Sequence, residues 1–78
     1  MVERMRDIVA AQEGVERIDE IKTRLFGSKV YVDVEISVDA EKTLLEAHGI
    51  AQRVHDAIEE GIPCVKHCMV HENPLTED

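Results

Sequence analysis

The segment VYVDVEISVD, residues 30–39, constrains the fold more than any other part of the sequence. Its even-numbered positions are Val or Ile, and its odd-numbered positions are Tyr, Asp, Glu, Ser and Asp. Because successive side chains of a strand point to opposite faces, this alternation predicts a β-strand with one buried face and one polar face. The polar face carries three carboxylates and the only Tyr of the chain. A sheet built on this strand has a core on one side and a charged surface on the other.

The segments before this strand are read from periodicity and turn residues. Residues 2–12 place apolar side chains at helical spacing and predict a short helix that ends at Gly14, a favourable C′ residue. Residues 15–26 predict a strand, with a bulge near 19–21 where the alternation is poor. Gly27-Ser28 suits a two-residue type II′ turn, so this strand and the next form a hairpin.

A long helix and a last strand complete the predicted fold. Residues 41–60 align their apolar side chains along one stripe, with Asp39 as the expected N-cap residue. Pro63 prevents continuation of the helix, and residues 64–72 predict a strand that stops at Asn73-Pro74. The order helix, strand, strand, helix, strand predicts an α+β, αββαβ open sandwich. Its three-stranded sheet carries both helices on one face.

Length and charge define the domain and exclude several functions. The 78 residues predict one domain, with an N-terminal helix in 1–13, a ββαβ body at 14–74 and an acidic tail at 75–78. The net charge of −8 argues against nucleic acid as a partner and favours cations. No apolar run approaches the roughly 20 residues needed to cross a bilayer. No nucleophile–base motif or phosphate loop is present, so we expect a binding domain rather than an enzyme.

The two cysteines, Cys64 and Cys68, do not form an obvious site. On a strand they lie about 13 Å apart, four residues at about 3.3 Å each, which is too far for a disulfide. Reduced thiols are therefore expected. His67 completes a C-x₂-H-C cluster, but a strand places it on the face opposite to both cysteines. Buried small apolar side chains are the favoured interpretation of the thiols, with a soft-metal site as the alternative.

Four side chains with metal-binding chemistry lie on three consecutive predicted elements. Asp33 and Glu35 are on the alternating strand, His48 is on the long helix and His71 is on the last strand. Carboxylate oxygen together with imidazole nitrogen is a donor set that Zn²⁺ accepts, so we expect a transition-metal site where these elements converge. Each residue also has a structural interpretation: a helix-edge His48, a surface His71, and carboxylates on a solvated sheet face.

Three segments, GVERIDEIKTRLFG, KVYVDVEISVDAEKTLLEAHGIAQRVHDAI and VKHCMVHENP, make the chain resemble a known family. It is similar to the C-terminal cytosolic domain of cation diffusion facilitator transporters, which export divalent metals from the cytoplasm by proton exchange. The resemblance extends from about Gly14 to Pro74. Its strongest support is the combination of EAH in the predicted helix with VHENP at the end of the last strand. It implies a metallochaperone-like fold that forms a homodimer. Metal bound between the protomers would regulate transport by the membrane domain of the same protein.

The resemblance also implies a location, a set of ligands and a choice of metals. The domain is expected at the cytoplasmic face of a membrane, as an excised part of a transporter rather than a stand-alone relative. Six positions match or adjoin ligand positions of the family: Asp33, Glu35, His48, His71, Asp19 and Glu72. Some zinc-exporting members have His where this chain has Asp19 and Glu35, and a second acid near Asn73. Zn²⁺ is the first expectation, and oxygen donors leave Fe²⁺, Mn²⁺ or Co²⁺ as alternatives. Tyr31-Val32-Asp33 is similar to the magnetosome-type iron and manganese transporters of the family.

Three functional hypotheses follow. In the first, a regulatory dimer forms when a cation neutralises acidic repulsion and bridges His48 and Asp33 or Glu35 with His71. In the second, the chain is a structural dimerisation module that does not sense metal. In the third, it is a soluble metal carrier, which predicts a monomer with an exposed thiol at Cys64 or Cys68.

Overall fold

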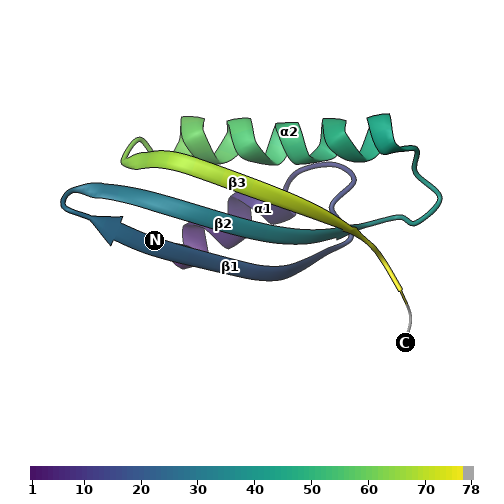
Figure 1. Ribbon diagram of the computed structural model, residues 1–78, viewed down its shortest axis with the longest axis horizontal. Coiled ribbons are helices and arrows are strands. Elements are labelled where there is room, and N and C mark those ends of the chain that lie inside the picture. The colour runs from purple at the N-terminus through teal and green to yellow at the C-terminus, as the bar shows by residue number, and fades with distance from the viewer. Residues whose placement is uncertain (77–78) are drawn as a thin grey trace.

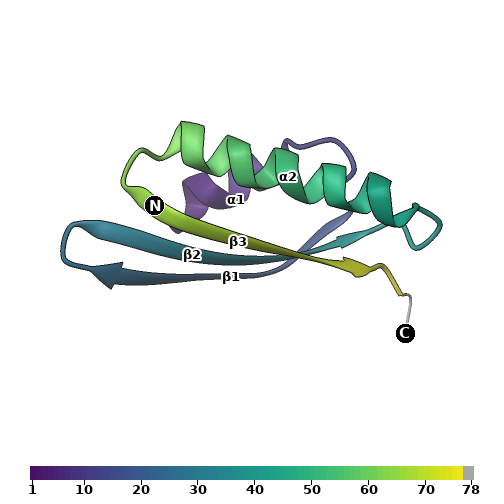
Figure 2. The ribbon, with the colours of Figure 1, turned by 45° about the horizontal axis from the view of Figure 1, so that its top comes forward.

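The structure, a computed structural model, describes residues 1–76 (Figure 1). Its elements follow the predicted order: α1 (Val2–Ala10), β1 (Arg17–Phe26), β2 (Lys29–Val38), α2 (Leu44–Gly61) and β3 (Val65–Pro74). The sheet has the strand order β1-β2-β3, with β1 antiparallel and β3 parallel to the central β2. Both helices lie on the same face of the sheet and leave the other face uncovered (Figure 2). The predicted αββαβ fold is therefore confirmed.

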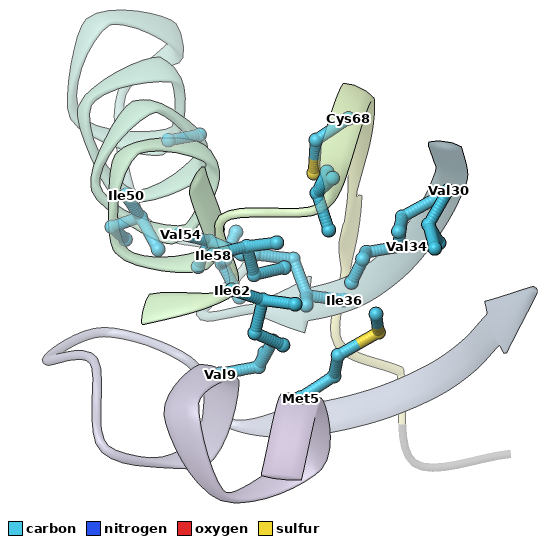
Figure 3. Close-up of a cluster of buried hydrophobic side chains, with 14 residues drawn as sticks. Met5, Val9, Val30, Val34, Ile36, Ile50, Val54, Ile58, Ile62 and Cys68 are labelled. Carbon is cyan, nitrogen blue, oxygen red and sulfur yellow. The ribbon is translucent and has the colours of Figure 1, made fainter. Parts of the chain in front are cut away.

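The core lies between the sheet and the two helices, and β2 supplies its centre. Val30, Val32, Val34, Ile36 and Val38 all point to the helical layer, and each is at most 3% exposed. They pack against buried side chains of both helices, among them Met5 and Val9 of α1 and Ile50, Val54 and Ile58 of α2 (Figure 3). Burial of such a face stabilises the fold by about 25 cal/mol for each Å² of apolar surface removed from water.

The N-terminus of α2 differs from the prediction. Asp39 is not the N-cap residue, because its Oδ1 accepts a hydrogen bond from the Glu41 amide (2.9 Å) in the turn that precedes the helix. Thr43 is the N-cap residue instead: its Oγ1 accepts from the Glu46 amide (3.1 Å), while Glu46 Oε1 accepts from the Thr43 amide (2.9 Å). Such a reciprocal pair satisfies two amides at once, so the helix begins at Leu44 rather than at residue 41.

The β1–β2 hairpin has the predicted geometry. Phe26 pairs with Lys29 across a two-residue turn, and Gly27 has a φ of +63° while Ser28 does not have a positive φ, as a type II′ turn requires. The bulge is also confirmed, since the register shifts between Ile18 and Glu20. This extra residue changes which β1 side chains face away from the helices.

Two further predicted boundaries are wrong. The first helix ends at Ala10 with Ala11 as its C-cap residue, so Gly14 belongs to the following loop. There it has a φ of +98°, and an added Cβ would lie 2.6 Å from Ile50 Cδ1. The last strand runs through Asn73 and ends at Pro74 rather than stopping at Glu72. Proline is tolerated at the end of an edge strand, and the Leu75 amide still donates to the Val38 carbonyl (2.7 Å). Residues 77–78 of the predicted acidic tail lie outside the described residues.

No helix within residues 1–76 has the length and apolar character needed to span a membrane.

Candidate metal centre

The uncovered face of the sheet holds a row of potential ligands that crosses all three strands. Glu35 on β2 pairs in register with Glu20 on β1 and with His71 on β3, so the three side chains are neighbours on one face. Asp33, one pleat away on β2, lies on the same face and lines a shallow cavity with them. Glu20, Asp33, Glu35 and His71 are called the open-face cluster. The central strand holds this cluster in place because its opposite face is buried.

Nearby polar groups compensate the open-face carboxylates only weakly. Arg24 Nη2 lies 3.4 Å from Asp33 Oδ2 and Lys22 Nζ lies 3.8 Å from Glu20 Oε2, and both basic side chains are mostly exposed. Asn73 Nδ2 donates to Glu35 Oε1 at 3.4 Å. Exposed pairs of this kind contribute between zero and about 1 kcal/mol each. The oxygens of these carboxylates are therefore held only loosely by their neighbours.

Asp19 sits on the bulge beside the open-face cluster and is already engaged. Its carboxylate accepts from Ser37 Oγ (2.7 Å), Arg17 Nε (2.7 Å) and Asn73 Nδ2 (3.4 Å). The Ser37 hydrogen bond, followed by the one from Arg17, lowers the pKa of Asp19 below its usual value. These contacts give Asp19 a structural role at the end of the uncovered face, whereas Glu20 occupies the register position opposite Glu35.

A second pair of potential ligands lies on the helical side. His48 Nδ1 of α2 is 2.9 Å from Glu72 Oε1 of β3. The two residues line a surface pocket with Gln52, His55 and Val70. Because β3 alternates, Glu72 faces the helices while His71 next to it faces the other way. His48 and Glu72 are called the helix-side pair.

The predicted ligands are therefore divided between two sides of the sheet within a single chain. His71, Asp33 and Glu35 share the uncovered face, whereas His48 and Glu72 share the helical side. Across residues 1–76, no three His, Cys, Asp or Glu side chains are arranged to hold one metal ion. A common site that includes both histidines would require a second chain. Whether the six predicted residues act as ligands stays a prediction.

The sequence interpretation did not include Glu20, whereas its neighbour Asp19 entered the predicted set through the family resemblance. A strict alternation from Ile18 points Glu20 toward the helices, but the bulge inserts one residue and turns Glu20 to the uncovered face. The poor alternation around residues 19–21 was the available signal. This signal located the bulge but did not indicate which side chain would turn to the uncovered face.

The cysteine cluster does not assemble either. Cys68 is buried in the core (Figure 3), where burial raises the pKa of its thiol to about 11, with further contributions from the charges of Glu59 and Asp33. Cys64 is exposed, so the expectation of a buried thiol is wrong for this residue. His67 lies on the uncovered face beside Tyr31, with 5.9 Å between the ring centroids. The three side chains do not form a common soft-metal site within the described chain.

The fold agrees with comparisons to known proteins. The chain belongs to the family described as "Cation efflux protein, cytoplasmic domain", whose model matches residues 1–75. This membership confirms the resemblance drawn from the sequence segments.

Curated relatives include two manganese efflux proteins of Bacillus subtilis (strain 168). The chain is 28% identical over 78 residues to "Manganese efflux system protein MneP", covering all of this chain and 26% of MneP. It is 36% identical over 64 residues to "Manganese efflux system protein MneS", covering 82% of this chain and 22% of MneS. The "Uncharacterized transporter YdbO" of the same organism is 36% identical over 73 residues, with 94% and 25% covered. The chain thus spans about a quarter of the length of these relatives.

Solved structures show the same fold. A manganese form of a MamM CTD variant superposes with a TM-score of 0.91 at 24% sequence identity, covering 95% of this chain and 94% of that one. A nickel form of another MamM CTD variant gives 0.92 at 23% identity, with 96% and 95% covered.

Proposed function

We propose that this chain is the metal-sensing dimerisation domain of a divalent-cation efflux transporter, with a binding role rather than a catalytic one. The open-face cluster is the observation that carries this proposal, because three carboxylates and an imidazole occupy neighbouring positions on the face that no helix covers. A second copy placed against this face brings two clusters together. Family membership supports the membrane part of the same transporter as the other partner, at the cytoplasmic side of the membrane.

Metal acts on the association of two copies by charge neutralisation. Each chain has a net charge of −8, and like charges that face each other across an interface oppose association. A divalent cation bound at the open-face cluster removes this repulsion and bridges donors of both chains. It shifts a population toward the closed dimer rather than folding the domain, because the core beneath the cluster is complete without it.

We assign Mn²⁺ as the first metal, ahead of Zn²⁺, Fe²⁺ and Co²⁺. The open-face cluster offers three oxygen-donor side chains and one nitrogen donor, and carboxylate-rich sites suit Mn²⁺ better than sites rich in imidazole or thiolate. MneP and MneS, whose names state manganese efflux, support the same order. The sequence alone placed Zn²⁺ first. The helix-side pair of His48 and Glu72 offers one nitrogen donor to one carboxylate, a higher proportion of nitrogen donors than in the open-face cluster.

Sedimentation velocity with and without metal tests the proposal. Mn²⁺ should shift the chain toward a compact dimer and raise its melting temperature, whereas Mg²⁺ at the same concentration should do so less. His71→Ala should abolish the Mn²⁺ response. His67→Ala is the matched control, because His67 lies on the same strand and face but outside the open-face cluster, and it should respond like the unchanged chain. A chain whose sedimentation and melting do not change with Mn²⁺, Zn²⁺ or Fe²⁺ would exclude metal sensing.

The second candidate is a structural dimerisation module that does not sense metal. It is supported by the geometry within one chain, because no three His, Cys, Asp or Glu side chains among residues 1–76 are arranged to hold one metal ion. Under this alternative the chain is dimeric at all metal concentrations, and His71→Ala leaves the dimer unchanged. A soluble carrier, which the exposed Cys64 thiol would suit, instead predicts a monomer under every condition.

A further inference from the structure

The acidic residues of this chain avoid one end of the sheet. None of its 17 Asp and Glu residues falls within residues 21–32 or 61–71, although these segments hold four of the nine Lys and Arg residues. The two segments meet in space, because Val30 pairs with Val65 and Tyr31 with His67. A chain with a net charge of −8 therefore has a locally basic end.

The same end exposes apolar side chains at the tip of the β1–β2 hairpin. Leu25 is 74% exposed and Phe26 is 57% exposed, immediately before the two-residue turn. Phe26 and Tyr31 lie side by side, with ring centroids 4.8 Å apart. On its other side, Tyr31 lies next to the ring of His67 on β3. The turn projects beyond the helical layer, so neither α1 nor α2 covers it (Figure 1).

The basic side chains around this tip are available for a partner. Lys22 and Arg24 are 65% and 70% exposed and make only long ion pairs, at 3.8 Å and 3.4 Å. Among the ion pairs of residues 1–76, none involves Lys29 or Lys66. The hairpin tip is defined here as an apolar set with a basic rim: Leu25, Phe26 and Tyr31 with Lys22, Arg24, Lys29 and Lys66.

We propose that the hairpin tip docks on the anionic surface of a lipid bilayer. Apolar side chains that project from a turn enter the boundary between headgroups and acyl chains, Lys and Arg beside them contact anionic headgroups, and Tyr favours this interface. The charge distribution selects a bilayer as the occupant, since a basic rim around an apolar tip complements a flat anionic surface.

The remaining charge of the domain sets its orientation on that surface. Glu59 and Glu60 end α2 at the same end of the molecule, but in the helical layer rather than at the hairpin. Because an anionic surface repels these carboxylates, the domain approaches with its sheet and hairpin first. The open-face cluster lies farther along the same sheet and is left accessible. The substitutions that test docking leave Lys22 and Arg24, the partners of Glu20 and Asp33, unchanged, so each of the two proposals can fail separately.

Vesicle co-sedimentation tests the proposal. The chain should sediment with vesicles of phosphatidylcholine and phosphatidylserine, bind vesicles of phosphatidylcholine alone far less, and be released by high salt. The double substitution Lys29→Gln/Lys66→Gln should weaken binding about fivefold for each charge removed. The double substitution Leu25→Ser/Phe26→Ser leaves the charge unchanged and should weaken vesicle binding more than the lysine substitutions do.

Leu44→Ser/Leu45→Ser is the matched control for the apolar change. These two leucines are 72% and 82% exposed at the opposite end of the molecule, where α2 begins. The control should bind phosphatidylserine vesicles like the unchanged chain, and so should His71→Ala, which separates lipid docking from the metal site. Far-ultraviolet circular dichroism checks that each variant is folded.

Phe26→Trp supplies a direct reading of insertion, because the chain has no other Trp. Its emission should shift to shorter wavelength when phosphatidylserine vesicles are added, and the shift should disappear in high salt. Three results would overturn the proposal: no binding to phosphatidylserine vesicles at low salt, equal loss of binding in the Leu44/Leu45 control, or tip substitutions that dissociate a dimer in the absence of vesicles. The last result would assign the tip to contact between two copies of the chain.

Discussion

The two faces of the central strand β2 perform different tasks with alternate residues of one segment. Toward the helices, its Val and Ile side chains are at most 3% exposed and form the centre of the core. On the other face, Asp33 and Glu35 are partly exposed and carry charge in the row shared with Glu20 and His71. The comparison shows that the buried core and the charged side chains proposed to bind metal are separated by direction rather than by position along the chain. Adjacent substitutions should therefore have different consequences.

The largest effect is expected on the helical face. Ile36 is fully buried, so Ile36→Ala should lower the free energy of unfolding by about 2–5 kcal/mol, because it removes apolar contacts and leaves a cavity. Glu35→Ala, one residue earlier on the uncovered face, should change it by no more than about 0.5 kcal/mol. Urea denaturation followed by circular dichroism measures both. Equal losses in the two variants would show that the two faces are not separate in function.

A double-mutant cycle on His48 and His71 asks whether the two sides of the sheet cooperate. Each single Ala substitution should weaken Mn²⁺ binding at least by the roughly tenfold factor that loss of even an outer-shell partner costs. If the helix-side pair and the open-face cluster are independent sites, each single variant should weaken one Mn²⁺ site and leave the affinity of the other unchanged, and the double variant should weaken both. If a second chain brings His48 next to His71 of its partner, the double variant should lose little more than either single one.

Isothermal titration calorimetry gives the affinities for this cycle, and His55→Ala is its control on α2. His55 lines the same pocket as His48 but is engaged with Asp56 and Glu59 of its own helix. It should leave Mn²⁺ affinity unchanged. If His55→Ala weakened Mn²⁺ binding as much as His48→Ala does, the metal would lie closer to His55 in this pocket than to the helix-side pair alone.

A smaller effect is expected where α2 begins, because the cap holds the helix that carries His48. Thr43→Ala removes one half of the capping box with Glu46 and should cost about 1 kcal/mol of stability. Asp39→Ala removes only the turn contact to the Glu41 amide and should cost less than half as much. Thermal denaturation ranks the two variants, and the reverse order would return the N-cap role to Asp39.

Periodicity predicted the fold because its two central elements have clear apolar patterns. The alternation of β2 and the stripe of α2 are strong signals, and they located the core and the uncovered face before any coordinates. The N-cap residue was missed because Asp39 and Thr43 are both good caps, and only the Glu three residues after Thr43 distinguishes them. The candidate ligands were chosen by residue type and by family resemblance, and neither indicates that strand direction divides them between the two sides of the sheet. The bulge then exchanged Asp19 for Glu20 in the row opposite Glu35.

The smallest effect concerns pH and the end of the uncovered face. The hydrogen bonds from Ser37 and Arg17 lower the pKa of Asp19 in the folded chain below the ordinary value of 3.8. The folded state therefore favours the charged carboxylate more than the unfolded state does. This contribution is fully present above the ordinary value and is lost as the pH falls through the lowered pKa. Because Arg17 is 55% exposed, we expect this contribution to the free energy of unfolding to be less than about 1 kcal/mol.

Asp19→Asn tests this contribution separately from the metal binding proposed for its neighbour Glu20. The variant should be slightly less stable than the unchanged chain at neutral pH, and the difference should shrink to zero in acid, where both side chains are uncharged. Glu20→Gln is the control, because Glu20 makes only a long, exposed contact with Lys22; it should not change this pH dependence but should weaken Mn²⁺ binding. Asp19→Asn could instead weaken Mn²⁺ binding and leave the loss of stability in acid unchanged. Asp19 would then be a metal ligand, and its hydrogen bonds to Ser37 and Arg17 would contribute little to stability.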